Sequence, residues 1–332
     1  MHLFRVGVTP DFYRDARGRF ETALEQKLGG VAGIEYAPLT AETLDDFDAI
    51  FALGFKMTRE SVRDLKRLTL VARWGVGYDM IDVDALTEAD IALAITPNAV
   101  KRPVAEAILT LIFALVKNLR EQDRIIREGK WRGDLSALGG TLEGKTLGSI
   151  GCGNIAREMF RLSASLGFAR FMAYDPFVND AGPGIDLVSL DEVLRADFVT
   201  VNTLLNAQTR GLIGERELRL MKTTAYLINT SRGPIVDQAA LTQALRQRRI
   251  AGAGLDVFES EPVPRDEPLL ALDNVVLAPH CLAWTTELAR DNGLEACDHI
   301  LSVFRGEVPE GVVNRDVLER PGFRAKLQRY LR

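Results

Sequence analysis

The chain has 332 residues, of which 47% are hydrophobic and 26% charged, a balance typical of globular proteins and sufficient for two domains. Its 46 acidic and 41 basic residues give a net charge of −5. There is no long basic run, so we expect neither a nucleic-acid partner nor an anionic membrane partner. The longest apolar run, residues 107–116, is too short to span a bilayer.

The three cysteines indicate a reducing environment. Cys152, Cys281 and Cys297 are too few and too scattered for a disulfide framework or a paired-cysteine zinc site. The N-terminal segment has only a short apolar run before it turns polar, which is unlike a signal peptide. We therefore expect a cytoplasmic protein without a metal.

The first hundred residues predict strands alternating with helices. Such alternation is typical of a parallel sheet that is covered on both faces. The predicted strands are residues 3–8, 49–53, 68–73 and 91–95, and the predicted helices are residues 20–28, 59–68 and 83–89.

Residues 95–99 predict a break in the chain before Pro103, a residue suited to the first turn of a helix. The helix that Pro103 opens is expected to reach about Glu128 and to join two domains. After Trp284 the pattern predicts another helix to about Arg305 and then a tail, residues 311–332, whose basic end forms a short exposed helix.

The second half of the chain predicts a complete doubly wound α/β sheet of six strands. Its helices fall between the strands, as they do in the first hundred residues. The predicted strands are residues 147–150, 171–174, 198–202, 226–229, 254–257 and 275–277.

A glycine-rich turn at residues 151–156, GCGNIA, separates the first of these strands from a predicted helix. A dinucleotide pyrophosphate needs a tight turn at Gly151, a bare backbone at Gly153 and a small residue at Ala156. Asp175 ends the next strand, where an acidic residue meets the ribose hydroxyls. An ordinary strand-to-helix turn with a solvated acid is the alternative. Cys152, inside the turn, is interpreted as a small apolar filler.

Polar residues follow the later strands, where ligands bind in such folds. Arg232 comes after the strand 226–229 and is suited to gripping a carboxylate with two parallel N–H donors. The alternative is a surface arginine or a structural ion pair. Asp256, at the end of the following strand, is placed to hold the carboxamide of a cofactor.

His280 follows the last strand and is the candidate for proton transfer. A histidine exchanges protons near neutral pH, and a carboxylate such as Glu261 fixes its tautomer and favours its charged form. The alternative is a buried histidine with a structural hydrogen bond. Of the other two histidines, His2 is expected in a flexible terminus and His299 is expected to pack or hydrogen-bond within a helix.

Several motifs together resemble the D-2-hydroxyacid dehydrogenase family, which includes phosphoglycerate, glyoxylate/hydroxypyruvate and D-lactate dehydrogenases. The resemblance spans nearly the whole chain. Its motifs, besides the glycine turn, are SRGPIVD (231–237), GAGLDVFESEP (252–262), APH (278–280), RWGVGYDMID (73–82) and VAE (104–106).

This resemblance implies a fold and a mechanism. A smaller, flavodoxin-like α/β substrate domain made of residues 1–100 and 285–332 would enclose an inserted Rossmann domain, residues 101–284, with the active site in the cleft. Hydride would pass between NAD(H) and a D-2-hydroxyacid/2-oxo acid pair. Arg232 would bind the substrate carboxylate and polarise the 2-oxo group, His280 would give or take the hydroxyl proton, and Glu261 would orient His280.

The resemblance also implies binding residues and a partner. Family members usually dimerise through their cofactor domains, so we expect a homodimer. Asp175 favours NAD because a carboxylate repels the 2′-phosphate of NADP. The expected cofactor-binding residues are Gly151, Gly153, Asn154, Ile155, Asp175, Thr203, Thr209, Thr230 and Asp256, and the expected substrate-binding residues are Arg73, Val76, Gly77 and Trp284.

The chain departs from the family pattern in three places. Asn202, Leu204 and Asn206 stand where the family more often has His, Pro and Thr, so the loop on the nicotinamide side is expected to differ in shape. Trp284 either lines the substrate pocket or packs at the domain junction. The pair at 101–102, Lys-Arg, favours a second acidic group on the substrate or is a solvated helix start.

Two other functions are consistent with the fold. A formate dehydrogenase typically has glutamine where Glu261 stands, which argues against that enzyme. A nicotinamide-sensing corepressor or scaffold is the second alternative, and the set of Arg232, Glu261 and His280 argues against it. The natural substrate stays open among glyoxylate, hydroxypyruvate, phenylpyruvate-like and phosphorylated acids.

Overall fold

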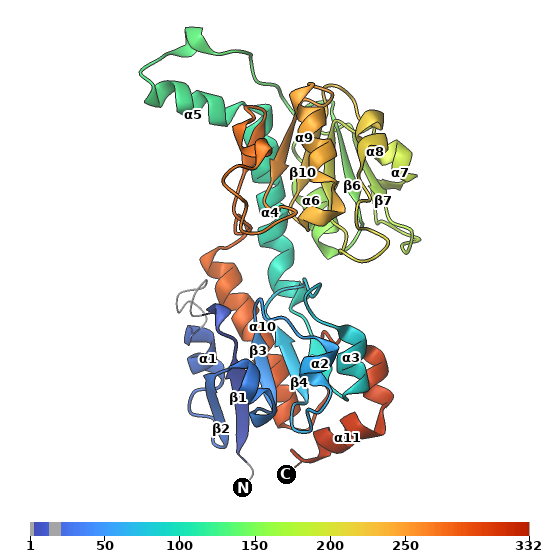
Figure 1. The fold of residues 1–332 in the computed structure, drawn as a ribbon. Helices are drawn as coiled ribbons and strands as arrows, with labels where there is room; N and C mark the ends of the chain where they lie inside the picture. The colour runs from blue at the N-terminus through green and yellow to red at the C-terminus, as the bar shows by residue number, and fades with distance from the viewer. Residues whose placement is uncertain (1–2, 13–20, 332) are drawn as a thin grey trace. The chain divides into compact units, whose positions relative to one another are not determined.

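The computed structural model describes residues 3–12 and 21–331 (Figure 1). The chain forms two compact units. Unit 1 combines Met1–Val100 with Trp284–Arg332, and unit 2 is Lys101–Ala283. The expectation for His2 lies outside the described residues, as does the first residue of the helix predicted at 20–28.

Unit 1 is built on a five-stranded parallel sheet in the order β2-β1-β3-β4-β5, which is the flavodoxin-like strand order. The strands are β1 (Phe4–Val8), β2 (Ile34–Pro38), β3 (Ala49–Ala52), β4 (Leu70–Arg73) and β5 (Ala92–Ala94). The helices of this unit are α1 (Glu21–Lys27), α2 (Arg59–Val62), α3 (Val83–Glu88), α10 (Thr286–Phe304) and α11 (Pro321–Gln328), with 3₁₀ turns η2 (Ala41–Asp46) and η6 (Arg315–Glu319).

Successive residues of these strands face opposite cores because the side-chain period of a strand is two. In β3, Phe51 joins a core with α1, α10 and α11, whereas its neighbour Ile50 joins a core with α2 and α3. Both faces of the sheet are therefore covered, as the alternation of strands and helices predicts.

Unit 2 is a seven-stranded parallel sheet in the order β12-β11-β10-β9-β6-β7-β8. The order reverses direction at β6, which is the doubly wound arrangement with its switch point between β6 and β9. The strands are β6 (Thr146–Ile150), β7 (Arg170–Tyr174), β8 (Ile185–Leu187), β9 (Phe198–Val201), β10 (Tyr226–Asn229), β11 (Gly252–Leu255) and β12 (Val275–Leu277).

Helices cover both faces of this second sheet. One core contains residues of α4 and α6, and the other contains residues of α7, α8 and α9. The helices are α4 (Pro97–Val116), α5 (Leu119–Arg127), α6 (Asn154–Ser163), α7 (Leu190–Val193), α8 (Glu215–Leu220) and α9 (Gln238–Arg246), with 3₁₀ turns η3 (Arg132–Asp134), η4 (Gly233–Ile235) and η5 (Pro268–Ala271).

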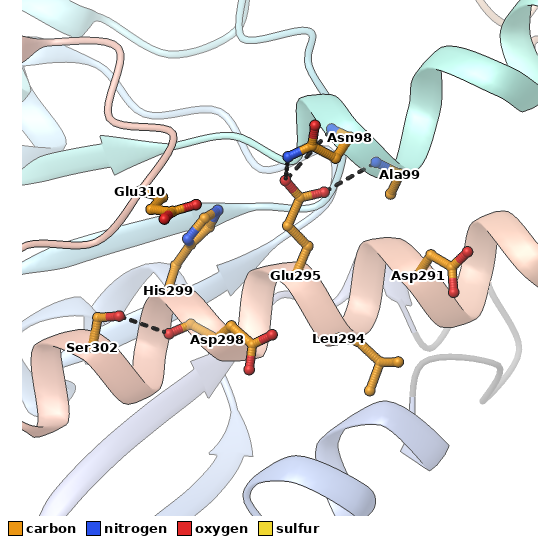
Figure 2. A pocket seen from close by; sticks show the side chains of 9 residues that line it. All are labelled: Asn98, Ala99, Asp291, Leu294, Glu295, Asp298, His299, Ser302 and Glu310. Atoms are coloured by element: carbon orange, nitrogen blue, oxygen red, sulfur yellow. Dashed lines mark hydrogen bonds between the residues drawn. The ribbon is translucent and has the colours of Figure 1, made fainter.

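The predicted break at residues 95–99 is wrong for its second half, because α4 begins at Pro97 and carries Pro103 inside it. The first turn of the helix is stabilised from a distant part of the sequence. The carboxylate of Glu295 accepts hydrogen bonds from the Ala99 N–H at 3.1 Å and from the Asn98 side-chain amide at 3.1 Å (Figure 2). A negative charge at a helix N-terminus is favourable, and no local pattern reveals it.

The expected helix to Glu128 is interrupted at Lys117 and Asn118. Asn118 has the left-handed φ of 50°, which ends α4 before α5 begins. The Val116 carbonyl accepts a hydrogen bond from the Gly140 N–H at 2.7 Å. The carbonyl that would accept the next hydrogen bond of a continuing helix is therefore already bonded to the loop that follows α5. The segment of α5 and the loop after it, residues 119–140, extends away from the sheet of unit 2 (Figure 1).

The C-terminal helix α11 forms, but the expectation that it is exposed is wrong. Phe323 and Leu327 are buried against the sheet of unit 1. The Lys326 ammonium donates hydrogen bonds to the carbonyls of Leu68 and Ala89, both at 2.8 Å. The basic residues of this helix suggest an exposed surface, but the helix has an apolar face. One of the basic residues, Lys326, is itself buried and donates two hydrogen bonds.

Two short edge strands were not predicted. β2 and β8 each lie at an edge of their sheet, and their side chains are mostly half-buried or exposed. Edge strands lack the continuous apolar run of a central parallel strand. The six predicted strands of unit 2 are nevertheless all present.

Candidate functional site

The glycine turn has the geometry that the sequence predicts. Gly151 follows β6 with φ of 98°, and a Cβ at this position would lie 2.4 Å from the Asn202 carbonyl oxygen. Only glycine fits both constraints. Gly153 caps α6, and a Cβ placed there would meet nothing within 4 Å. The turn is therefore packed against β9 on one side and open at the helix end.

Asp175 follows β7 directly and joins the turn to the loop beyond that strand. Its carboxylate accepts hydrogen bonds from the Cys152 N–H at 2.9 Å and from the Phe177 N–H at 3.0 Å. Cys152 is buried, and burial raises the pKa of its thiol above the usual value. This agrees with the interpretation of Cys152 as an apolar filler.

The loop after β9 is closed by its own side chains. The Asn206 carboxamide oxygen accepts from the Gln208 N–H at 2.9 Å and the Thr209 N–H at 3.0 Å, and the Thr209 hydroxyl donates to the Leu204 carbonyl at 2.5 Å. Thr203 lies half-buried at the start of this loop. Asn206 and Thr209 therefore hold this loop in a defined conformation through hydrogen bonds within the loop.

Arg232 lies in a loop that Asn229 organises. The Asn229 side chain donates to the Arg232 carbonyl at 2.9 Å and accepts from the Ser231 N–H at 3.0 Å. Gly233 allows a close approach, since a Cβ there would lie 1.9 Å from the carbonyl carbon of Phe258. The loop that carries Arg232 therefore packs directly on the loop that leads to Glu261.

Glu261 and His280 form the predicted pair. The Glu261 Oε2 atom lies 2.7 Å from Nδ1 of His280, and Oε1 accepts from the Phe258 N–H at 2.9 Å. Burial raises the pKa of Glu261, but these two hydrogen bonds and the charge of Arg232 outweigh burial, so the pKa lies below its usual value. Glu261 is therefore an anion at neutral pH.

His280 itself has a left-handed backbone, with φ of 54°, which is uncommon for a residue other than glycine. The Asp256 carboxylate holds the segment that follows, accepting from the Cys281 N–H at 3.1 Å and the Leu282 N–H at 3.2 Å. Burial raises the pKa of Asp256 above its usual value, against the opposing effect of these hydrogen bonds. Asp256 thus supports the turn that presents His280.

Three adjacent strands, β12, β11 and β10, deliver these residues to one edge of the sheet. Arg232 follows β10, Glu261 follows β11 and His280 follows β12. The strands are parallel, so their carboxyl ends lie together. A cation, an anion and a histidine are thus gathered at the edge where ligands bind in open α/β sheets.

Three of the residues expected to bind substrate lie at the end of β4 or just after it, and the fourth, Trp284, lies just before α10. Arg73 donates from Nε to the Gly77 carbonyl at 2.8 Å and also bonds the Trp74 carbonyl, so it shapes the loop. No hydrogen bond from the Val76 or Gly77 N–H is found in the part of the chain that the structure describes. Trp284 packs edge to face on Trp74, with ring centroids 6.0 Å apart.

A hollow of about 620 Å³ in unit 1 is lined by residues of α10, by the first turn of α4 and by Glu310 (Figure 2). Its lining is acidic, but much of the charge is already neutralised within the unit. Asp298 pairs with Lys27 at 2.7 Å, and His299 bonds the Ile95 carbonyl from Nε2 at 3.0 Å. None of the predicted site residues lines it. His299 has the structural role within a helix that was expected.

The described residues contain neither a membrane-spanning helix nor a metal centre. No helix between residues 3 and 331, apart from the undescribed 13–20, has the length and apolar character to cross a bilayer. In the same part of the chain, no group of three or more His, Cys, Asp or Glu side chains is arranged to hold a metal ion.

Comparison with known proteins identifies the family. Residues 109–281 match the model of the D-isomer specific 2-hydroxyacid dehydrogenase NAD binding domain. A glyoxylate reductase of Korarchaeum cryptofilum is 36% identical over 329 residues, covering 96% of this chain and 99% of the relative. The chain belongs to this family.

Other relatives in the family carry different substrate names. A D-3-phosphoglycerate dehydrogenase of Methanocaldococcus jannaschii is 35% identical over 94% of this chain, which spans 60% of that protein. The structure of a D-lactate dehydrogenase from Aquifex aeolicus, complexed with NAD and lactic acid, matches with a TM-score of 0.79 and 26% identity over 91% of this chain and 96% of that one. The predicted family, the Rossmann fold and an NAD-dependent enzyme are thus confirmed.

The residues at the turn fit NAD. The open space at Gly153 leaves room for a pyrophosphate. The N-terminus of α6, which no side chain caps, provides N–H donors for it. The Thr230 hydroxyl, after β10, is buried without a hydrogen-bond partner among the described residues. A buried hydroxyl of this kind is normally satisfied, so a ligand group in the site would supply its partner.

Sequence reasoning missed the residues that support the site. Asn229 and Gly233 fold the Arg232 loop, and Arg157 donates from its guanidinium to the carbonyls of Cys152, Asp180 and Ala181. Asn229 could have been identified from the sequence, because it ends a predicted strand and lies shortly before a predicted site residue. Arg157 has no such signal, since it bonds only to backbone carbonyls, one five residues before it and two more than twenty residues after it.

Proposed function

We propose that the chain transfers hydride between NAD(H) and a small or medium D-2-hydroxyacid/2-oxo acid pair, with His280 as the acid/base. The observation that carries the proposal is the 2.7 Å hydrogen bond between Glu261 and His280 Nδ1. It lies at the carboxyl edge of the NAD-binding sheet, beside the loop of Arg232. Relatives named for glyoxylate, phosphoglycerate and lactate support a 2-hydroxyacid or 2-oxo acid as the substrate class.

The pairing assigns a role to each nitrogen of His280. Because Nδ1 is engaged by Glu261, Nε2 is the atom that exchanges a proton with the substrate oxygen. The anionic carboxylate stabilises the protonated imidazole that reduction requires. Glu261 therefore acts through His280 and is a positioning residue, which also argues against the formate dehydrogenase alternative.

Arg232 supplies the positive charge. Reduction of a 2-oxo acid places negative charge on the carbonyl oxygen next to a carboxylate, and a guanidinium can contact both groups. When bound, the oxidised cofactor NAD+ would accept the hydride and the reduced cofactor NADH would donate it. In unit 1, the N–H groups of Val76 and Gly77 are suited to binding a carboxylate, which supports that unit as the substrate-binding domain.

The test is turnover of a panel of 2-oxo acids with NADH at fixed salt, followed by chiral analysis of the product. We expect NADH oxidation with at least one member of the panel and a D-2-hydroxyacid product. A chain that binds the dinucleotide tightly but reduces no 2-oxo acid would contradict the proposal. That outcome would favour the nicotinamide-sensing corepressor or scaffold instead.

We also propose that two copies associate through unit 2. Residues 119–140 extend away from the sheet (Figure 1) and expose large apolar side chains, which are favourable at an interface. These side chains are Leu119, Ile126, Trp131 and Leu138. Light scattering is expected to give a dimer mass, and a Trp131→Ser, Leu138→Ser double variant is expected to give a monomer. A monomeric wild-type chain would contradict this proposal.

A further inference from the structure

The loop after β4 is fixed on both sides of the two N–H groups that are suited to a carboxylate. On one side, Arg73 donates from Nε to the Gly77 carbonyl at 2.8 Å. On the other side, the Gly75 N–H donates to the Thr96 hydroxyl oxygen at 2.7 Å, and the Gly75 carbonyl accepts from the Thr96 N–H at 3.2 Å. The N–H groups of Val76 and Gly77 lie between these two attachments, so their directions depend on both.

Thr96 is itself oriented by a residue far along the chain. Its hydroxyl donates to the side-chain carbonyl oxygen of Asn292 at 2.6 Å, and the two residues are buried, with exposed fractions of 0% and 1%. A threonine hydroxyl has one hydrogen and two lone pairs. Because the hydrogen is directed at Asn292, a lone pair is left to accept from the Gly75 N–H. The loop after β4 is therefore connected to α10 through two buried side chains.

One face of α10 holds the whole segment that contains Thr96. Asn292, Glu295 and His299 are spaced by three and four residues, which places them on the same face of the helix. Glu295 bonds the first turn of α4, and His299 bonds the Ile95 carbonyl (Figure 2). Of these three contacts, the one made by Asn292 continues through the Thr96 hydroxyl to the loop after β4.

Thr69 is a second buried threonine of the same sheet, and it has no such connection. It is 0% exposed, its hydroxyl donates to the Arg67 carbonyl at 3.2 Å, and it lies 3.2 Å from the Tyr330 hydroxyl. Thr69 comes just before β4, whereas the carboxylate loop comes just after this strand. Thr69 therefore matches Thr96 in residue type and burial but lies at the opposite end of the strand.

We propose that Thr96 and Asn292 are positioning residues for the substrate. Thr96 fixes the Gly75 backbone, and Asn292 fixes the direction of the Thr96 hydroxyl. This inference rests on the proposed function, in which the N–H groups of Val76 and Gly77 bind the carboxylate of a 2-oxo acid. The carboxylate is bound in the ground state and in the transition state alike, so a misplaced loop raises KM and changes kcat little.

Steady-state kinetics with NADH and the 2-oxo acid that wild type reduces best provide the first test. Thr96→Val keeps the shape of the side chain and leaves the Gly75 N–H without its acceptor, so we expect KM to rise roughly tenfold with little change in kcat. Thr96→Ser retains the hydroxyl and is expected to keep the KM of wild type. Asn292→Leu leaves the Thr96 hydroxyl in place without its acceptor and is expected to raise KM by a smaller factor. Thr69→Val is the matched control, which should lower the free energy of unfolding and leave KM unchanged.

Calorimetric binding of oxamate to the NADH complex is the second test, and it requires no turnover. Oxamate carries a carboxylate next to a carbonyl, as a 2-oxo acid does. Its affinity is expected to fall in Thr96→Val by the factor by which KM rises, and NADH affinity is expected to be the same in all the variants.

Three results would overturn the inference. They are an unchanged KM and oxamate affinity in Thr96→Val and Asn292→Leu, an equal loss in the Thr69→Val control, and a Thr96→Ser variant as impaired as Thr96→Val. A chain that depends on Thr96 for oxamate binding but reduces no 2-oxo acid would refute only the proposed hydride transfer. A wild-type chain that neither binds oxamate nor reduces a 2-oxo acid would refute both.

Discussion

Replacing Glu261 with glutamine tests the proton chemistry most specifically. The substitution keeps the shape of the side chain and removes its charge from the hydrogen bond of 2.7 Å to His280. An anion next to the imidazole favours its protonated form, which is the form that reduction consumes. Removing the anion should therefore lower kcat/KM for reduction.

The size of the loss follows from the exposure of the pair. A hydrogen bond to a charged group contributes roughly 1.5–3 kcal/mol. The side chains are 42% and 36% exposed, so solvent screening reduces the charge contribution to about 1–1.5 kcal/mol. Since about 1.4 kcal/mol corresponds to a factor of ten in a rate constant, kcat/KM for reduction should fall about tenfold.

The assay is kcat/KM for NADH-dependent reduction, measured for the wild type and the variant at one pH and one salt concentration. Glu259→Gln is the matched control, because Glu259 lies in the same loop with an exposed side chain. An unchanged kcat/KM in Glu261→Gln would refute the pairing argument. An equal loss in Glu259→Gln would show that the loop's net charge, and not the hydrogen bond, sets the rate.

Four further substitutions test the cofactor turn and the fold. Asp175→Asn should raise the NADPH to NADH ratio of kcat/KM about tenfold or more, because a charge that repels a 2′-phosphate is lost; equal use of both cofactors by the wild type would remove the claim. Gly151→Ala should lower the free energy of unfolding by more than about 1 kcal/mol, since its Cβ would lie 2.4 Å from a carbonyl oxygen. Gly153→Ala should have the same free energy of unfolding as wild type but weaker NADH binding. Tyr330→Phe should lower the free energy of unfolding in urea by about 1–3 kcal/mol, because the Tyr330 hydroxyl donates to buried Asp48 at 2.8 Å. Burial raises the pKa of Tyr330, so wild type, more than the variant, should lose stability as pH rises past the usual tyrosine value of about 10.

Central elements of the fold follow from local sequence patterns. The strands β6, β7, β9, β10, β11 and β12 lie in the interior of the second sheet or carry apolar runs, and each was predicted within a few residues. The edge strands β2 and β8 were missed because they are largely exposed on at least one face. A run of apolar residues indicates a buried strand, and edge strands are less buried than the central strands of a sheet.

Long-range polar contacts account for the wrong helix boundaries. The first turn of α4 is stabilised by Glu295, almost two hundred positions later in the chain, and the end of α4 is set by Gly140 returning to Val116. α11 is buried through Phe323 and Leu327, and its Lys326 donates to carbonyls of Leu68 and Ala89, more than two hundred positions earlier. Contacts of this kind depend on the tertiary fold, which local propensity does not contain.

The candidate site was more accessible to sequence reasoning than its supports. Glycine, acid and histidine at strand ends carry their own chemical signature, and the structure brings Glu261 and His280 within hydrogen-bond distance. Asn229 shapes the Arg232 loop and lies at the end of a predicted strand, which is a position that the sequence indicates. Arg157 bonds to backbone carbonyls and carries no motif, so its role follows only from coordinates.

The proposed role of His280 is to supply the proton for NADH-dependent reduction of a 2-oxo acid. Steady-state reduction and calorimetric NADH binding in wild type and His280→Ala test this role. The variant is expected to lose turnover while NADH binding stays nearly intact, because His280 is not among the residues assigned to the cofactor. A variant that retains most of its activity would contradict the claim.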